Sequence, residues 1–129
     1  MNKYRVLVDS SVWIQYFKFG KTEVLTRLIE NDLVCTNELI LSELGPKLIH
    51  QKRIDIWESL NALEKVAVKV DWDVIRNYQL MNLKSGINNV EIPDLIIMQQ
   101  VIEEKLVLYT FDKHFKLMNT FLNFELIRY

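Results

Sequence analysis

The chain has 129 residues, half of them hydrophobic, and its 16 lysines and arginines nearly balance 17 acidic residues, so the net charge is −1. This composition is typical of one globular domain, which we expect to span residues 1–129. The chain lacks a general basic surplus, so any nucleic-acid binding would depend on local clusters. Cys35 is the sole cysteine, and the sequence shows neither a signal-peptide pattern nor an apolar run near the ~20 residues of a membrane span. We therefore expect a soluble, cytoplasmic protein that does not contact membranes.

The first part of the chain alternates short apolar strands with helices. Residues 4–8 predict a strand buried on both faces, because they are mostly apolar and show no alternation with polar residues. Residues 33–35 predict a second strand. Gly45-Pro46 is expected to interrupt the helix after that strand, since proline disfavours helical geometry in the preceding residue. The helices expected here run from about residue 10 to 20, from 22 to 30, from 36 or 37 to 44, and from 46 to 50.

The second part repeats this alternation. It predicts strands at 66–70, 106–109 and 124–127. Pro93 is expected at the first position of a largely apolar helix, where proline is tolerated. Short apolar strands alternating with helices are typical of an α/β fold, so we predict a three-layer α/β/α sandwich with a central, mainly parallel sheet. The helices expected here span 55–63, 72–84, 95–102 and about 113–118.

Acidic residues lie where such a fold binds ligands, outside the carboxyl ends of its strands. Asp9 follows the first strand and Asp112 follows the strand at 106–109. Glu43 and Asp94 lie on helices that we expect to leave the same edge. Each has a simpler explanation when taken alone: Asp9 and Asp112 could cap helices, Asp94 could interact with a helix dipole, and Glu43 could be solvated.

Taken together, the four acids favour a metal site. Their mutual repulsion would make such a cluster costly without a cation, and hard divalent ions such as Mg²⁺ and Mn²⁺ prefer oxygen ligands. One or two ions held there could activate water for in-line attack on a phosphodiester. No other motif competes, because His50 and His114 lack the spacing of a zinc site and the chain has no glycine-rich phosphate loop.

Four segments, in this order and spacing, resemble the PIN domain, and more closely the VapC-type toxins of toxin–antitoxin pairs. They are VDSSVWI at 8–14, ELILSEL at 38–44, IPD at 92–94 and LYTFDKHF at 108–115. The resemblance covers nearly the whole chain. It implies a central parallel sheet surrounded by helices and an endoribonuclease that uses Mg²⁺ or Mn²⁺. It also implies a homodimer, a cognate antitoxin and an RNA substrate.

The resemblance also implies site residues. The metal-binding, catalytic acids of the family fall on Asp9, Glu43, Asp94 and Asp112. A hydroxyl residue beside the first acid falls on Ser10, and a threonine two residues before the last acid falls on Thr110; we expect both to orient a carboxylate or water. One position departs from the family pattern: His114 stands where many relatives carry a further acid, which puts a full second metal site in doubt.

Two basic clusters are candidate RNA contacts in this acidic chain. Their alternative is an ordinary solvated helix face. One lies beyond Glu43 and the other beside Asp112. Their members are Lys47, His50, Lys52 and Arg53 in the first, and Lys113, His114 and Lys116 in the second.

Three other functions compete with the ribonuclease. A receiver-like signalling domain would need a phosphoacceptor after a central strand, but Asp55, near the right distance, lies in a segment with a helical pattern. A PIN-like module could bind RNA or protein without cleaving. A nuclease acting on DNA would use the same acids. A carboxylate–metal site acts on the phosphate, which RNA and DNA share, so the acids alone do not distinguish the two sugars.

Overall fold

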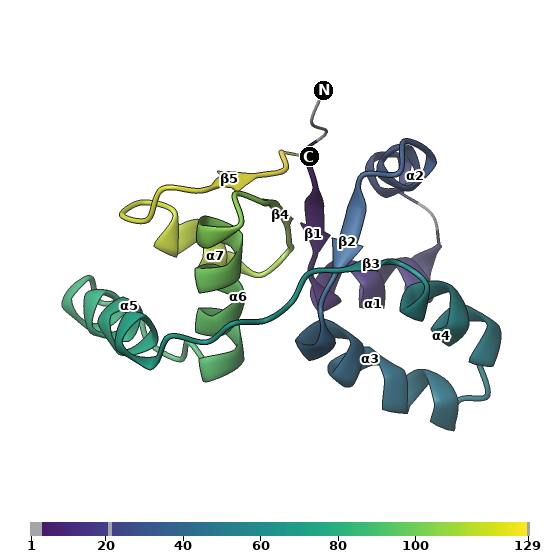
Figure 1. Ribbon diagram of the computed structural model, residues 1–129, viewed down its shortest axis with the longest axis horizontal. Coiled ribbons are helices and arrows are strands. Elements are labelled where there is room, and N and C mark those ends of the chain that lie inside the picture. Colours follow the sequence, from purple (N-terminus) through teal and green to yellow (C-terminus); the bar gives the residue numbers. More distant parts are fainter. Residues whose placement is uncertain (1–3, 21, 129) are drawn as a thin grey trace.

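A five-stranded parallel sheet forms the centre of the molecule in the computed structural model, which describes residues 4–20 and 22–128 (Figure 1). The strand order is β3-β2-β1-β4-β5, and every neighbouring pair is parallel. The strands are β1 (Val6–Val8), β2 (Val34–Thr36), β3 (Glu64–Lys65), β4 (Val107–Tyr109) and β5 (Glu125–Leu126).

Helices cover both faces of this sheet. In Figure 1, α1 to α4 lie to one side of β1 and β2, and α5 to α7 lie to the other. This arrangement confirms the predicted three-layer α/β/α sandwich. None of the helices in the described part of the chain is long and apolar enough to cross a membrane. The helices are α1 (Ser10–Phe19), α2 (Glu23–Glu30), α3 (Glu38–His50), α4 (Ile54–Asn61), α5 (Trp72–Lys84), α6 (Ile92–Glu103) and α7 (Lys113–Met118).

The central strand explains the apolar start of the chain. All three residues of β1 are buried, because β1 pairs with β2 on one edge and β4 on the other and has helices over both faces. Such a strand has no solvent side, so its sequence shows no alternation. Helix α6 is buried in the same way: every residue from Leu95 to Val101 is buried, including two glutamines.

One of these glutamines explains an error in the predicted strands. Residues 66–70 were expected to form a strand, but the third strand is Glu64–Lys65, two residues earlier. The Gln100 side chain donates to the carbonyls of Val66 (3.1 Å) and Ala67 (3.0 Å), so these groups pair with a side chain and continue no ladder. The following residues cross instead towards α5 (Figure 1).

The predicted interruption at Gly45-Pro46 is also wrong, because α3 continues without a break from Glu38 to His50. Pro46 cannot donate to the carbonyl four residues earlier. That carbonyl belongs to Ser42, an exposed residue, so water can solvate it. Leu44 and Leu48 are buried on either side of the proline, and their packing holds the helix together. Pro93 likewise differs by one position, being the second residue of α6.

Gly45 allows α3 to approach α4 closely. A Cβ atom placed on Gly45 would lie 2.9 Å from Cζ3 of Trp57, well inside normal contact distance. Gly45→Ala should lower the free energy of unfolding by about 1 kcal/mol, because an overpacking cost of about 1–3 kcal/mol exceeds a helix-propensity gain of about 1 kcal/mol. Urea denaturation of wild type and Gly45→Ala would measure this change in the free energy of unfolding.

The matched experiment repeats Gly45→Ala in a Trp57→Leu background. There the indole is gone, so the alanine should become neutral or stabilising. An equal loss of stability in both backgrounds would contradict the close approach.

Candidate functional site

The carboxyl ends of β1 and β4 lie at the topological switch point of the sheet. Strands β2 and β3 follow β1 on one side, and β4 and β5 lie on its other side. Crevices at such switch points are the usual ligand sites of parallel sheets. Asp9 follows β1 here, and its backbone N–H donates to the carbonyl of Tyr109 at 2.9 Å. Two segments a hundred residues apart are thereby joined at the sheet edge.

The Asp9 carboxylate is held by hydroxyl groups. It is buried, with 6% of its surface exposed. Its Oδ2 accepts hydrogen bonds from Thr110 Oγ1 (2.8 Å) and Ser11 Oγ (2.9 Å). Among residues 4–20 and 22–128, the hydrogen bond recorded for its Oδ1 is a long one of 3.5 Å from Ser10 Oγ. Asp9 stands at the N-cap position of α1, yet among the described residues its side chain caps no backbone N–H. The capping explanation therefore fails for Asp9, and Oδ1 is the oxygen that a ligand could use.

Ser11 and Thr110 also connect the two loops that carry acids. Thr110 Oγ1 accepts from the backbone N–H of Asp112 at 3.0 Å, and Ser11 Oγ accepts from the N–H of Phe111 at 3.1 Å. Each hydroxyl thus donates to Asp9 and accepts from the loop after β4. Sequence analysis singled out Thr110 but not Ser11 as a supporting residue. The only signal was a second serine directly after Ser10.

Ser10 links Asp9 to Glu43. Glu43 lies on the exposed side of α3, but its Oε2 accepts a 2.8 Å hydrogen bond from Ser10 Oγ at the start of α1. This bond draws the Glu43 carboxylate towards the carboxyl end of β1. The alternative, that Glu43 is an ordinary solvated glutamate, does not account for this hydrogen bond.

Asp94 enters the same region from the first turn of α6. Its Oδ2 accepts from the backbone N–H of Glu91 at 3.3 Å, a helix-capping contact. The pKa of Asp94 is raised to about 6, mainly because the carboxyl group is partly buried; the Glu91 N–H lowers it, and the carboxylates of Asp112, Asp9 and Glu91 add to the rise. Asp94 therefore lies close enough to both acids to feel their charge. A shift of this kind is typical of functional sites.

Asp112 interacts with the residue that departs from the family pattern. It caps α7, with Oδ1 accepting from the backbone N–H of His114 at 2.9 Å. The same oxygen lies 3.0 Å from His114 Nδ1. The capping explanation is correct for Asp112, and its Oδ2 takes no part in these two contacts. His114 places an imidazole, and no further carboxylate, beside Asp112.

Within residues 4–20 and 22–128, no group of three or more His, Cys, Asp or Glu side chains is placed to hold one ion. The four expected acids therefore form no cage around one point: Asp94 interacts electrostatically with Asp9 and Asp112, and Glu43 accepts a hydrogen bond from Ser10. Their chemistry still fits a hard cation, because all donors are carboxylate oxygens and Mg²⁺ commonly uses one or two carboxylates with several waters.

The basic clusters occupy different places. Lys47 and Arg53 line a groove of about 260 Å³ that also borders α1. The guanidinium of Arg53 lies over the ring of Phe17, with 5.5 Å from Cζ to the ring centre. His50 and Lys52 are exposed at the end of α3. In the second cluster Lys113 is exposed on α7, His114 contacts Asp112, and Lys116 borders a separate hollow.

The sequence of the chain matches the PIN domain family over residues 6–119. The chain therefore belongs to the PIN domain family. No curated protein matches the sequence closely enough to suggest a role.

Solved structures show the same fold. The DNA-bound VapBC of Salmonella typhimurium superposes with a TM-score of 0.77 at 16% identity, covering 97% of this chain and 98% of that one. VapBC-5 of Mycobacterium tuberculosis gives 0.70 at 21% identity, with 98% and 100% covered. VapC20 of Mycobacterium tuberculosis, described as a toxin that cleaves the sarcin-ricin loop, gives 0.60 at 15% identity, with 87% and 93% covered.

The raised pKa of Asp94 predicts that its charge destabilises the metal-free protein. An acid with a raised folded-state pKa stabilises the fold fully below its ordinary value of 3.8, and this stability is lost as pH rises through about 6. Asp94→Asn keeps an oxygen for the Glu91 N–H and removes the charge. In EDTA at pH 7.5 it should raise the free energy of unfolding by about 1–2 kcal/mol.

Thermal and urea unfolding of wild type, Asp94→Asn and Asp55→Asn would test this. Asp55 is an exposed acid on α4, so its substitution should change stability by less than about 0.5 kcal/mol. The advantage of Asp94→Asn should shrink at pH 4.5. A less stable Asp94→Asn protein at pH 7.5 would contradict the electrostatic interpretation.

Proposed function

We propose that this protein is a metal-dependent endoribonuclease and the toxin of a toxin–antitoxin pair. The observation that carries the proposal is the convergence of Asp9, Asp94 and Asp112 at the β1–β4 switch point, with Glu43 connected through Ser10. The PIN family and the VapC fold support it. So does the description of VapC20 as an RNA-cleaving toxin, which favours RNA over DNA.

Each residue has a distinct part in this proposal. Asp9 Oδ1 and Asp112 Oδ2 are the oxygens that the surrounding hydrogen bonds leave for a Mg²⁺ or Mn²⁺ ion. Asp94 adds charge to the same side of the site, and a cation would offset the burial and the repulsion that together raise its pKa. The ion, when bound, would lower the pKa of water and neutralise charge on the phosphate. Glu43, with an oxygen beyond its bond from Ser10, can accept a proton or orient water.

The hydroxyl groups position the carboxylates. Thr110 and Ser11 hold Asp9 Oδ2, so the carboxylate plane is set before any ligand arrives. Groups in this role affect metal affinity or activity by about 10- to 100-fold in other sites. His114 orients Asp112 and brings no additional negative charge, which favours a single cation over a pair.

The proposed partners follow from the solved structures. VapBC-5 is described as a member of the VapBC family of toxin–antitoxin systems, and the Salmonella typhimurium structure as a DNA-bound VapBC. By analogy we propose that a cognate antitoxin binds this chain and that the toxin forms a homodimer. Co-purification with the product of any small reading frame beside this gene would test the first, and light scattering would test the second.

Cleavage of a mixed pool of structured RNAs tests the activity. Wild-type protein should cleave with Mn²⁺ or Mg²⁺ and stop in EDTA. Asp9→Asn should lower the rate at least about 100-fold because it removes a ligand charge, and Thr110→Val should lower it about 10- to 100-fold because one Asp9 bond is lost. Gel electrophoresis of labelled RNA would measure the rates.

The control is Asp55→Asn, which removes the same charge from an exposed position on α4. It should cleave like wild type. Calorimetric titration with Mn²⁺ gives a second measurement, since Asp9→Asn should weaken binding and Asp55→Asn should not. Metal binding without cleavage would indicate a non-cleaving binding module, and equal cleavage by Asp9→Asn would refute the site.

A further inference from the structure

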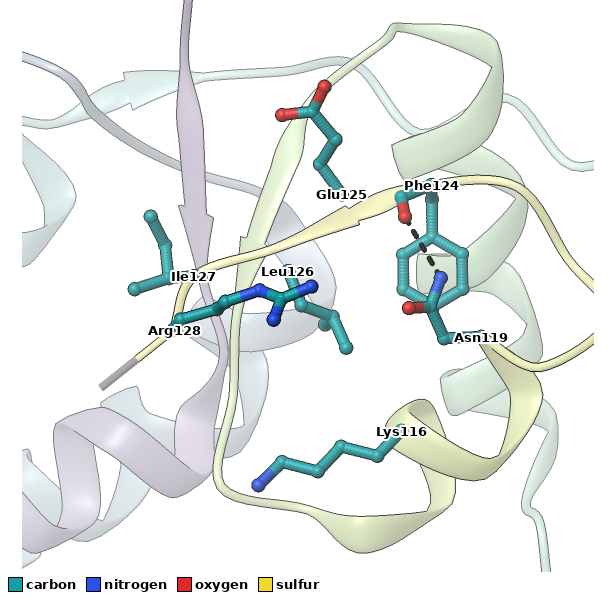
Figure 2. A pocket seen from close by; sticks show the side chains of 7 residues that line it. All are labelled: Lys116, Asn119, Phe124, Glu125, Leu126, Ile127 and Arg128. Atoms are coloured by element: carbon teal, nitrogen blue, oxygen red, sulfur yellow. Dashed lines mark hydrogen bonds between the residues drawn. The ribbon is translucent and has the colours of Figure 1, made fainter.

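An open hollow of about 620 Å³ lies between α7 and β5, outside the acidic site (Figure 2). Two cations border it: Lys116 extends from α7, and Arg128 extends from the chain just after β5. Phe124 and Leu126 form an apolar part of its wall, and both are half-buried. Arg128 belongs neither to the acidic site nor to the two basic clusters defined from the sequence.

The hollow lies at the same edge of the sheet as the acids, the edge formed by the carboxyl ends of the strands. Strand β5 is parallel to β4, and the last backbone bond of this pair runs from Ile127 N–H to the Leu108 carbonyl at 2.9 Å. Arg128 therefore follows the carboxyl end of β5, as Thr110 follows β4 and Asp9 follows β1. These strands are neighbours in the order β1-β4-β5, about 5 Å apart each.

The other cation is positioned by helix α7. Lys116 lies four residues after Asp112, and side chains at this spacing lie on the same face of a helix. A strand of RNA whose phosphate reached Asp112 could thus continue along α7 to Lys116. The Asn119 amide donates to the carbonyls of Leu122 (3.2 Å) and Phe124 (2.9 Å), which ties the chain before β5 to the end of α7. These bonds keep the hollow at a defined width.

The chemistry of the hollow fits a nucleotide. Arginine and lysine bind phosphate oxygens, arginine often with two parallel hydrogen bonds. A partly exposed apolar and aromatic wall can receive the face of an unpaired base. One acid, Glu125, also lines the hollow, but Figure 2 shows its carboxylate on the far side of β5 from Lys116. It does not lie between the two cations.

We propose that this hollow binds one nucleotide of a single-stranded RNA next to the cleaved bond, with the phosphate between Lys116 and Arg128 and the base against Phe124. The proposal rests on the proposed ribonuclease function and adds a substrate subsite to it. In this way the β5 edge of the sheet would give the protein a preference for single-stranded RNA.

Binding of a fluorescein-labelled, mixed-sequence 12-nucleotide RNA to the full chain tests this. Fluorescence anisotropy would be measured in EDTA, in the Asp94→Asn background, at several salt concentrations. Lys116→Gln/Arg128→Gln should weaken binding about 10-fold at 0.1 M salt. It should also flatten the slope of log Kd against log salt by about 1.4, since each phosphate contact to a single strand contributes about 0.7.

The matched control is Arg76→Gln/Lys84→Gln, which removes the same charge from exposed positions on α5. It should change Kd less than about 2-fold. All variants alter exposed side chains, and circular dichroism would verify folding. Equal effects of the two double variants would overturn the subsite, because the loss would then reflect net charge alone.

A cleavage assay separates the two hypotheses. If the wild type cleaves RNA while Lys116→Gln/Arg128→Gln, without the Asp94 substitution, shows an unchanged KM, the ribonuclease stands and the subsite is wrong. If the double variant raises KM about 10-fold with kcat within 2-fold, the subsite is supported. If the wild type neither binds nor cleaves RNA, the ribonuclease function itself fails and the subsite with it.

Discussion

The pairing of β1 with β4 is the interaction on which the rest of the site depends. The two strands are about a hundred residues apart in the chain, and their parallel ladder aligns Val6 to Val8 with Val107 to Tyr109. This register carries Asp9 to the side of Thr110, where the 2.8 Å hydrogen bond from the hydroxyl to Oδ2 becomes possible. A shift of one strand by one residue would turn its side chains to the other face of the sheet, so that Asp9 and Thr110 would no longer face each other. Burial of the apolar strand therefore also sets the position of the first acid.

The site is a compromise between stability and function. Asp9 is buried and Asp94 is partly buried, and burial together with neighbouring charges makes the ionised form of Asp94 costly. Hydroxyl and backbone groups donate hydrogen bonds to the carboxylates of Asp9 and Asp112. Buried acids that cost stability are found mostly at functional sites of proteins. A cation is the simplest group that removes the remaining repulsion.

The fold was largely predictable because its signals are local. Short apolar segments gave the strands, and helical periodicity with caps such as Asn37, whose Oδ1 accepts from the Ile40 N–H, gave most helices. The two larger errors have tertiary causes. The α3 helix continues through Pro46 because buried leucines on both sides outweigh one lost hydrogen bond. The strand expected at 66–70 ends early because Gln100, on a distant helix, takes the carbonyls of Val66 and Ala67.

The sequence by itself indicated the four candidate acids, two that follow strands and two that lie on helices, and the class of fold that brings strand ends to one edge. These follow from residue type and local pattern. Only the tertiary structure decided that β4 lies beside β1, that Ser11 holds Asp9, and that His114 contacts Asp112. Tertiary structure likewise decided that Asp94 is the acid with the raised pKa. Hydrogen bonds and electrostatic interactions depend on distances between segments far apart in the chain, and only packing of the complete core sets those distances.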